Sequence, residues 1–300
     1  MREAAAPSGL EGTYKGRSIE GFLDLHFYRP VGYSLALAAR RLSLTPATLT
    51  LTGGVLGVTA GVFYRHAELP INLAGMFLHV LSNAFDNADG QLARLTKTGS
   101  REGRALDGLI DNLIFASIYV HLCVRYTSAG GSALIWLLML AAAGSHSVQS
   151  AAADHLRNAY LYFTGQRSEL DSSKVLRPLE VDLSWQKTPW KKLLFSLYLN
   201  YTREQEFLFP RVVKLREMSE AALGRIALAY ATAGKPVIKL AGALTTNARM
   251  LVLFIFLLLS RPEWYLWTEV TALNLCLLIV ISKQNSLTKK LESNNVAAVC

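Results

Sequence analysis

Apolar residues recur along this 300-residue chain in stretches of about the length of a membrane-spanning helix. Six stretches predict transmembrane helices, because roughly 20 apolar residues cross the hydrocarbon core of a bilayer. They lie at about 47–64, 71–85, 108–124, 132–153, 241–260 and 264–282. Polar or ionisable residues interrupt several of them, notably the second and third, so a strict hydropathy window would miss those. The pattern predicts an all-α, polytopic membrane protein with six transmembrane helices.

The segment before the first span has the spacing of an amphipathic helix. Its apolar residues at helical spacing are Phe22, Leu23, Phe27, Val31, Leu35 and Ala38. This spacing predicts an N-terminal interfacial amphipathic helix, and a plain soluble leader helix is the alternative. Arg29-Pro30 is expected to bend it. Thr45 is expected to cap the first span, with Pro46 at the first helical position.

These elements divide the chain into five parts. They are a cytoplasmic tail with the interfacial helix (1–44), transmembrane helices 1–4 (45–165), a cytoplasmic insertion with amphipathic helices (166–240), transmembrane helices 5–6 (241–283) and a cytoplasmic tail (284–300). The N-terminus lacks the apolar core of a signal peptide, so the first span is expected to act as an uncleaved anchor.

Composition and charge agree with a membrane protein. Hydrophobic residues make up 51% of the chain and charged residues only 18%, more apolar than a soluble domain needs. The segments 1–46, 94–104, 157–240 and 283–300 carry 6, 4, 14 and 3 Lys and Arg residues, whereas the opposite turns hold Arg65, Arg125 and Arg261. The positive-inside rule therefore places both termini in the cytoplasm.

Two other classes find little support in the sequence. The net charge of +9 is not arranged as a basic stripe with interleaved aromatic residues, which argues against nucleic-acid binding. Cys123, Cys276 and Cys300 lie far apart, so neither a disulfide framework nor a zinc knuckle is expected.

Four aspartates gather at the cytoplasmic ends of the second and third spans. Asp86 and Asp89 are three residues apart, and Asp107 and Asp111 are four apart, so each pair shares a helix face. Two antiparallel helices joined by a short basic turn would aim both faces at one point. Two divalent cations with oxygen ligands would offset the repulsion between the carboxylates. In the alternative reading, the acids pair with the basic residues of a solvated turn, which are Arg94, Lys97, Arg101 and Arg104.

Small residues and an arginine accompany the acids. Gly90, Ala93 and Gly103 remove side-chain bulk, which lets phosphates approach the backbone. Arg94 adds a planar cation for phosphate oxygens.

The spacing D-x2-D-G-x2-A-R-x8-G-x3-D-x3-D resembles the signature of the CDP-alcohol phosphotransferase family, also called the CDP-alcohol phosphatidyltransferase family. All eight fixed positions match, between Asp86 and Asp111. The likeness extends to the six spans, the interfacial helix and the Thr-Pro entry into the first span, and it weakens after about residue 160. Ala47 stands where many members have Asn.

The resemblance implies a mechanism and its partners. Asp86, Asp89, Asp107 and Asp111 would ligate two Mg²⁺ or Mn²⁺ ions that bridge a CDP pyrophosphate. Asp111 would also act as the general base for the acceptor hydroxyl. Gly90, Ala93, Arg94 and Gly103 would line the CDP pocket, and CMP would leave. The expected partners are a CDP-activated donor, an acceptor alcohol, the bilayer and a second copy in a homodimer.

The substrates stay open at this stage. The motif serves both CDP-diacylglycerol with a polar alcohol, as in phospholipid biosynthesis, and a CDP-headgroup with a lipid alcohol. Cations that could bind a phosphorylated acceptor are Lys97, Arg101, Arg104, Arg157 and Arg249. Arg249 lies inside a predicted span, so the alternative for it is a side chain that snorkels to the interface.

The insertion and the overall function also have alternatives. Residues 190–209 are aromatic-rich with Lys191, Lys192 and Arg203, as in a helix on an anionic membrane surface, and residues 211–232 have the spacing of a cytoplasmic helix or a subunit contact. A packed cytoplasmic cap explains them as well. A membrane prenyltransferase and a transporter are the alternative functions. A prenyltransferase would show Asp-rich motifs in both halves of the chain, whereas here the acids occupy one pair of adjacent predicted helices. A transporter would show repeat symmetry with broken helices, which the sequence does not show.

Overall fold

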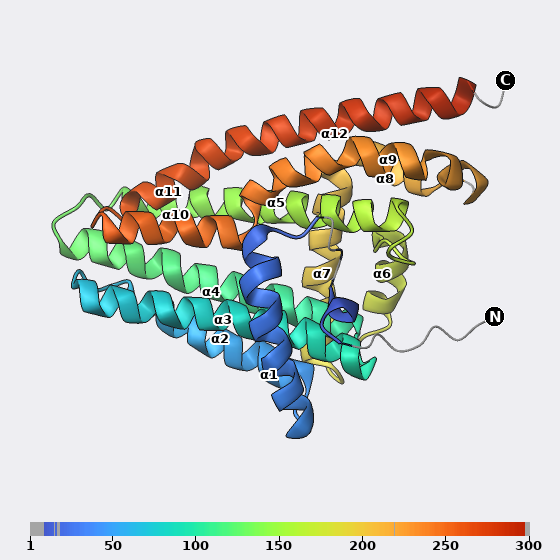
Figure 1. The fold of residues 1–300 in the computed structure, drawn as a ribbon. Helices are drawn as coiled ribbons and strands as arrows, with labels where there is room; N and C mark the ends of the chain where they lie inside the picture. Colours follow the sequence, from blue (N-terminus) through green and yellow to red (C-terminus); the bar gives the residue numbers. More distant parts are fainter. Residues whose placement is uncertain (1–8, 15, 17–18, 219, 298–300) are drawn as a thin grey trace. The chain divides into compact units, whose positions relative to one another are not determined.

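The computed structural model of the protein describes residues 9–14, 16, 19–218 and 220–297. Helices are the only regular secondary structure among these residues, which confirms the predicted all-α class. The chain divides into two compact units (Figure 1). The first comprises Met1–Ala143 with Leu253–Leu266, and the second comprises Gly144–Val252 with Trp267–Cys300.

The first unit is built around four helices that follow one another in the chain. They are α1 (Arg29–Arg41), α2 (Pro46–Phe63), α3 (Leu69–Thr96) and α4 (Arg101–Ser128), joined by the start of α5 (Ile135–Phe163), the end of α10 (Thr246–Leu258) and part of α11 (Glu263–Val270). The predicted start of α2 is confirmed, because the Thr48 amide donates to Thr45 Oγ1 at 3.2 Å and Pro46 occupies the first turn.

The second unit holds the helices of the insertion and the end of the chain. They are α6 (Ser173–Val181), α7 (Pro189–Leu208), α8 (Pro210–Arg216), α9 (Glu220–Ala241) and α12 (Ala272–Ala297), with the remainder of α5, α10 and α11. Within this unit α7 packs against α6, and α9 packs against α12. The insertion is therefore a folded helical region.

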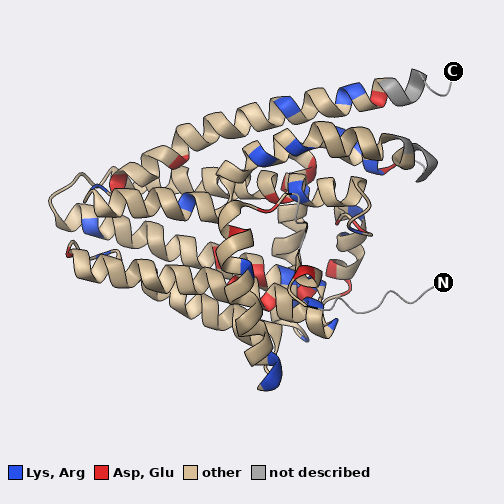
Figure 2. Ribbon diagram, in the orientation of Figure 1, with Lys and Arg blue, Asp and Glu red and all other residues tan. Residues whose placement is uncertain are grey.

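Four helical segments are long and apolar enough to cross a membrane. They are Pro46–Phe63, Arg101–Ser128, Ile226–Leu258 and Glu263–Ser293, which overlap the first, third, fifth and sixth predicted spans. The first of them, α2, holds no charged residue (Figure 2).

The predicted second and fourth spans, in α3 and α5, do not meet the same hydropathy criterion. Their polar residues explain why. His79 and Asn83 in α3, and His146 and Gln149 in α5, are polar but buried. Such side chains lower the hydropathy of a helix while facing the protein instead of lipid. The count of six spans stays a prediction.

Glycines let α2 approach both α3 and α4 closely. A Cβ on Gly53 would lie 3.2 Å from the Cβ of Phe85 in α3, and one on Gly54 would lie 2.7 Å from Cγ2 of Ile110 in α4. On Gly57 it would lie 2.7 Å from side-chain atoms of both Ile114 and Ser82. Small residues allow this close packing of helix backbones in membrane proteins.

Replacing Gly57 with Val is expected to lower the free energy of unfolding by about 1–3 kcal/mol, because the added carbons overpack the junction of α2 with α3 and α4. A thermal denaturation series in detergent measures the change. Gly144→Ala is the matched control, since a Cβ there meets nothing within 4 Å. Equal melting temperatures for both variants would contradict the close packing at Gly57.

Candidate active site

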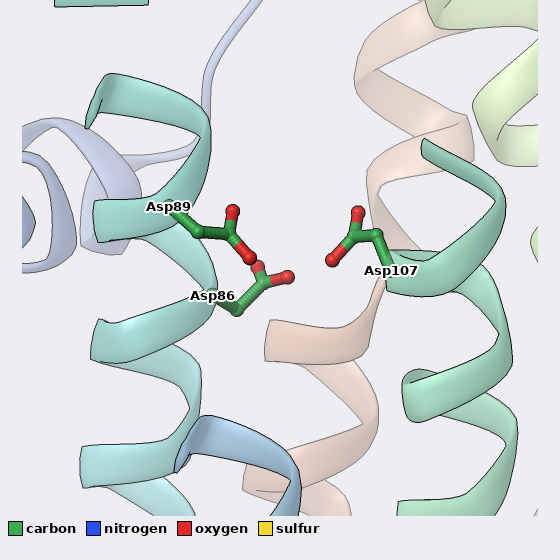
Figure 3. A group of neighbouring side chains, drawn as sticks. All are labelled: Asp86, Asp89 and Asp107. Atoms are coloured by element: carbon green, nitrogen blue, oxygen red, sulfur yellow. The ribbon is translucent and has the colours of Figure 1, made fainter. Parts of the chain in front are cut away.

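Three of the four predicted aspartates come together at the facing sides of α3 and α4. One carboxylate oxygen each from Asp86, Asp89 and Asp107 lies within 4.8 Å of the other two. Figure 3 shows Asp86 and Asp89 reaching from one helix toward Asp107 on the other. Asp89 is buried, and the other two are half-buried. The spacing argument from the sequence thus placed these side chains correctly on converging helix faces.

Asp111 lies one turn beyond Asp107 on α4 and is half-buried. It does not belong to the group of three described carboxylates that lie within 4.8 Å of one another. Its part in metal binding and its role as a base therefore stay predictions.

A threonine of α2 supports the aspartate cluster. The hydroxyl of Thr50 donates a short hydrogen bond to Oδ2 of Asp89, and both side chains are buried. Sequence reasoning missed Thr50 because the two residues are 39 positions apart. Helix α2 also carries Thr48, Thr52 and Thr59, so no local signal singles out Thr50.

Arg94 follows Asp89 on α3, beyond the apolar part of that helix. Its Nε and Nη2 atoms are buried and have no hydrogen-bond partner among the described residues. A Cβ on Gly90 would lie 3.5 Å from Nη1 of Arg94, in ordinary van der Waals contact with the guanidinium. Buried donors without acceptors are costly, which suits a site completed by a ligand with acceptor oxygens.

The charge of Arg94 persists at neutral pH. Burial, and then the nearby charge of Arg29, lowers the pKa of Arg94 to about 10, while Glu20 and Asp89 act in the opposite direction. The guanidinium is therefore cationic in the range where enzymes work.

The N-terminal segment packs against α3 beside this arginine. Gln91 is buried on α3, and its Nε2 donates to Thr13 Oγ1 at 2.9 Å and to the Arg29 carbonyl at 3.2 Å. The guanidinium of Arg29 is buried and donates to both oxygens of Glu20, at 2.9 and 3.0 Å. These residues were not among the sequence predictions, because nothing local indicates that residues 13 and 91 meet.

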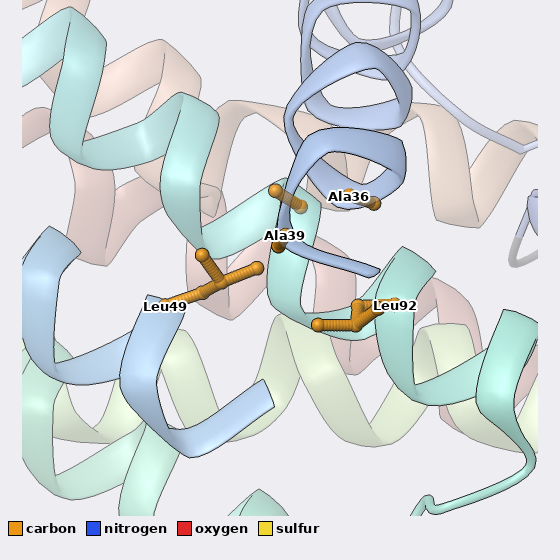
Figure 4. Close-up of a cluster of buried hydrophobic side chains, with 5 residues drawn as sticks. Ala36, Ala39, Leu49 and Leu92 are labelled. Atoms are coloured by element: carbon orange, nitrogen blue, oxygen red, sulfur yellow. The ribbon is translucent and has the colours of Figure 1, made fainter. Parts of the chain in front are cut away.

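Helix α1 is held on α3 by small apolar residues. Five residues form a buried cluster (Figure 4): Ala36, Ala39, Leu49, Ala88 and Leu92. A π-helical turn over Asp24–Tyr28 leads directly into α1, whose first turn contains Arg29 and Pro30. The bend expected at Arg29-Pro30 stays a prediction. The interfacial role of this helix stays a prediction.

Gly103 and Ala93 lie on the two helices that carry the aspartates. Ser100 caps α4, and the Gly103 amide donates to Ser100 Oγ at 2.9 Å. Ala93 is half-buried, one residue before Arg94. The turn between α3 and α4 spans only residues 97–100, and Lys97 there adopts a left-handed backbone conformation with φ of 54°.

The predicted acceptor-binding cations differ in their surroundings. Lys97 and Arg104 are exposed in the first unit. In the second unit, Arg157 is half-buried and has no hydrogen bond or ion pair with the other described residues.

Arg249, also in the second unit, is only 1% exposed, so the snorkelling alternative is wrong for it. Its Nε lies 3.1 Å from Oε1 of Glu269, and its other two nitrogens donate to Ser150, Gln149 and the Leu244 carbonyl. Each of its three nitrogens thus has a protein partner.

The aspartate cluster fits a divalent cation by its chemistry. Carboxylate oxygens are the ligands that Mg²⁺ and Mn²⁺ prefer, and the cluster offers three within 4.8 Å. The hydrogen bond from Thr50 orients one of them, as the groups behind metal ligands usually do.

Thr50→Val is expected to weaken Mn²⁺ binding about tenfold, because it removes the donor that orients Asp89. Titration of the purified protein with Mn²⁺, followed by electron paramagnetic resonance, measures the affinity. Thr52→Val is the matched control, since the Thr52 hydroxyl is exposed and bonds only to its own helix at Thr48 O. Unchanged Mn²⁺ affinity in the Thr50 variant would contradict the orienting role.

Comparison with known protein families gives one match in this region. Residues 43–160 match the family model described as CDP-alcohol phosphatidyltransferase, which confirms the resemblance carried by the motif. The match covers α2, α3, α4 and most of α5, whereas residues 161–300 lie outside it. The family transfers phosphate-containing groups and depends on metal ions. No curated protein matches the chain.

Proposed function

We propose that the protein, whose residues 43–160 form a CDP-alcohol phosphatidyltransferase domain, transfers a phosphatidyl group from CDP-diacylglycerol to an acceptor alcohol in phospholipid biosynthesis. One observation carries this proposal. Helix α3 presents two clustered carboxylates and, one turn on, an arginine with two buried unpartnered nitrogens. A metal-bound pyrophosphate would satisfy both groups at once.

Each residue of the motif has a role in the proposed reaction. Asp86, Asp89, Asp107 and Asp111 hold two divalent cations, Mg²⁺ or Mn²⁺. When bound, the metal ions supply charge stabilisation at the attacking and leaving oxygens. Arg94 donates to the pyrophosphate, and Gly90, Ala93 and Gly103 leave room for the CDP moiety along the backbone.

Asp111 takes the proton from the acceptor hydroxyl in the transfer step. The acceptor oxygen then forms a bond to the phosphorus furthest from the cytidine. The bond between that phosphorus and the bridging oxygen breaks in line, and CMP leaves with the electron pair.

The membrane arrangement that supports this reaction has six spans, an interfacial N-terminal helix and both termini in the cytoplasm. The distribution of Lys and Arg supports the sidedness, and the buried polar residues of α3 and α5 support these helices as the two further spans. Donors could then reach the aspartates from the cytoplasmic side. A homodimer stays a prediction from the family resemblance.

The predicted acceptor-binding cations favour a phosphorylated alcohol as the acceptor. Arg157 supports it best, because it is half-buried and unpartnered within the described residues. Lys97 and Arg104 lie at unfixed positions within the motif, whereas Arg249 is engaged by protein groups. Transfer of a CDP-activated headgroup to a lipid alcohol is the second candidate, since the motif serves both directions.

Purified wild-type protein in lipid with Mg²⁺ or Mn²⁺, CDP-diacylglycerol and a panel of alcohols is expected to release CMP. The panel includes phosphorylated alcohols, and a parallel reaction supplies CDP-headgroups with diacylglycerol. Chelation by EDTA is expected to abolish CMP release. The absence of CMP with every donor and acceptor, from protein shown to be folded, would overturn the proposed function.

Asp111→Asn is expected to keep the affinity for the CDP donor within a few fold and to lower turnover by about a hundredfold or more, because it removes the base. CMP release and equilibrium CDP binding separate the two effects. Asp182→Asn is the matched control, since Asp182 is exposed in the second unit. Wild-type turnover in the Asp111 variant would exclude the base role.

Arg94→Lys is expected to weaken CDP binding about tenfold, because a lysine cannot make the paired donations of a guanidinium. Calorimetric titration with CDP in the presence of Mn²⁺ measures the affinity. Arg40→Lys serves as the control, since Arg40 is exposed at the end of α1. If both variants bind CDP as the wild type does, Arg94 does not contact the pyrophosphate.

A further inference from the structure

Large apolar side chains are exposed at the turn between α6 and α7 in the second unit. Val181, Trp185 and Trp190 are 63%, 58% and 72% exposed. Phe195 and Leu199, on the same helix as Trp190, are buried. The hairpin of α6 and α7 thus has an apolar core of its own, and the side chains at its turn lie outside that core. Exposed tryptophans so close together mark an interaction surface.

Polar contacts fix the shape of this hairpin. Glu180 at the end of α6 pairs with Lys192 of α7 at 2.8 Å and accepts a hydrogen bond from Ser196, also at 2.8 Å. The Tyr198 hydroxyl donates to Oδ2 of Asp171 at 2.8 Å. The exposure of the tryptophans is therefore a property of the folded hairpin.

The predicted surface-lying helix stays a prediction, to which the structure adds contacts. The sequence assigned residues 190–209 to an anionic membrane surface through Lys191, Lys192 and the aromatic residues. Lys192, however, is engaged by Glu180, and Phe195 packs inward. Apolar side chains that face outward lie at the turn before α7 and along α7 itself, where Trp190, Leu197 and Phe207 are 72%, 42% and 84% exposed.

The exposed charges around the turn are mostly positive. Arg177, Lys187 and Lys191 are exposed, and Asp182 is the exposed acid between them. Tryptophan with lysine is the pairing typical of segments that lie among lipid headgroups, where the indole is half in apolar surroundings and the ammonium faces anionic lipid.

The position of α7 on α5 sets the depth of this hairpin. Helix α7 crosses α5 instead of running along it (Figure 1), and the two touch where Gln205 Nε2 lies 3.2 Å from Oδ2 of Asp154. The ring of Phe209, just after α7, stacks on His155 with centroids 5.5 Å apart. The predicted span in α5 ends at residue 153. A helix that crosses α5 there lies at the depth where the predicted span leaves the hydrocarbon.

We propose that the α6–α7 turn, residues 181–190, docks on the headgroup layer of an anionic bilayer, with Trp185 and Trp190 inserted and Lys187 and Lys191 facing the lipid charge. This rests on the proposed membrane topology and not on the proposed chemistry. The insertion would then hold itself on the membrane beside the span from which it emerges.

Fluorescence quenching by brominated lipids tests the docking with the full-length protein. The protein is placed in nanodiscs of phosphatidylcholine, with or without 30% phosphatidylglycerol, whose acyl chains are brominated close to the headgroups. The signals of the two tryptophans are obtained by subtracting the spectra of Trp185→Phe and Trp190→Phe from that of the wild type. We expect both signals to be quenched, and more strongly with the anionic lipid.

Charge variants test the anionic preference. Lys187→Gln and Lys191→Gln are each expected to weaken the docking equilibrium about fivefold on anionic nanodiscs, since one basic residue near such a surface contributes about that much. Lys174→Gln is the matched control, because Lys174 lies near the start of α6, at the end of the hairpin away from the turn, where it pairs with Glu217 at 2.5 Å. Its quenching is expected to equal that of the wild type.

Three results would overturn the proposal. Unquenched Trp185 and Trp190 in both lipid mixtures would exclude docking on the bilayer. If the two tryptophans are shielded from the brominated lipid only when two protein copies share a nanodisc, the surface would be assigned to a second copy of the chain. Equal quenching with and without anionic lipid, unaffected by either lysine variant, would remove the anionic lipid as the partner. None of these readouts depends on CMP release.

Discussion

Carboxylates held within 4.8 Å of one another repel, and at the edge of an apolar helix pair water screens that repulsion less than in bulk. The first unit is arranged around this constraint. Glycines bring α2 close enough to α3 for the Thr50 hydroxyl to reach Asp89, so one carboxylate is oriented before any ligand arrives. Arg94 places a cation nearby on the same helix, and two of its nitrogens have no hydrogen-bond partner among the described residues. A divalent cation held between the carboxylates would offset the repulsion between them.

In the second unit, by contrast, buried charges are neutralised by other protein groups. Arg249 and Glu269 are both fully buried and neutralise each other at 3.1 Å, and Arg249 also donates hydrogen bonds to Ser150 and Gln149. Truncating one partner of such a pair leaves an uncompensated charge, so the network stabilises the packing of the helices that carry it. An arginine in an apolar segment is therefore not by itself a sign of a ligand site. The unpartnered nitrogens of Arg94 are the feature that separates the two cases.

The sequence could predict whatever depends on local spacing. Helical periodicity gave the convergence of Asp86, Asp89 and Asp107, and the Thr45-Pro46 pair gave the start of α2. Contacts between distant segments were out of reach, since Thr50 and Asp89 are 39 positions apart and Thr13 and Gln91 are 78 apart. The same reason explains the insertion, where amphipathic spacing could not distinguish a face packed on a neighbouring helix from one turned toward lipid.

The N-terminal segment shows how a motif can be extended by the rest of a chain. Gln91 occupies one of the unfixed positions between Gly90 and Ala93, and it is this side chain that bonds to Thr13 and to the Arg29 carbonyl. A lone Arg29 beside Arg94 would add repulsion, but its paired donation to Glu20 makes the two residues neutral as a unit. The N-terminal segment, which is neutral and hydrogen-bonded here, can therefore bury the guanidinium of Arg94 and still leave its charge available to a phosphate. The fixed positions of the motif would then carry the proposed chemistry. Gln91, at an unfixed position, would attach the N-terminal segment, which would keep water from the site of that chemistry.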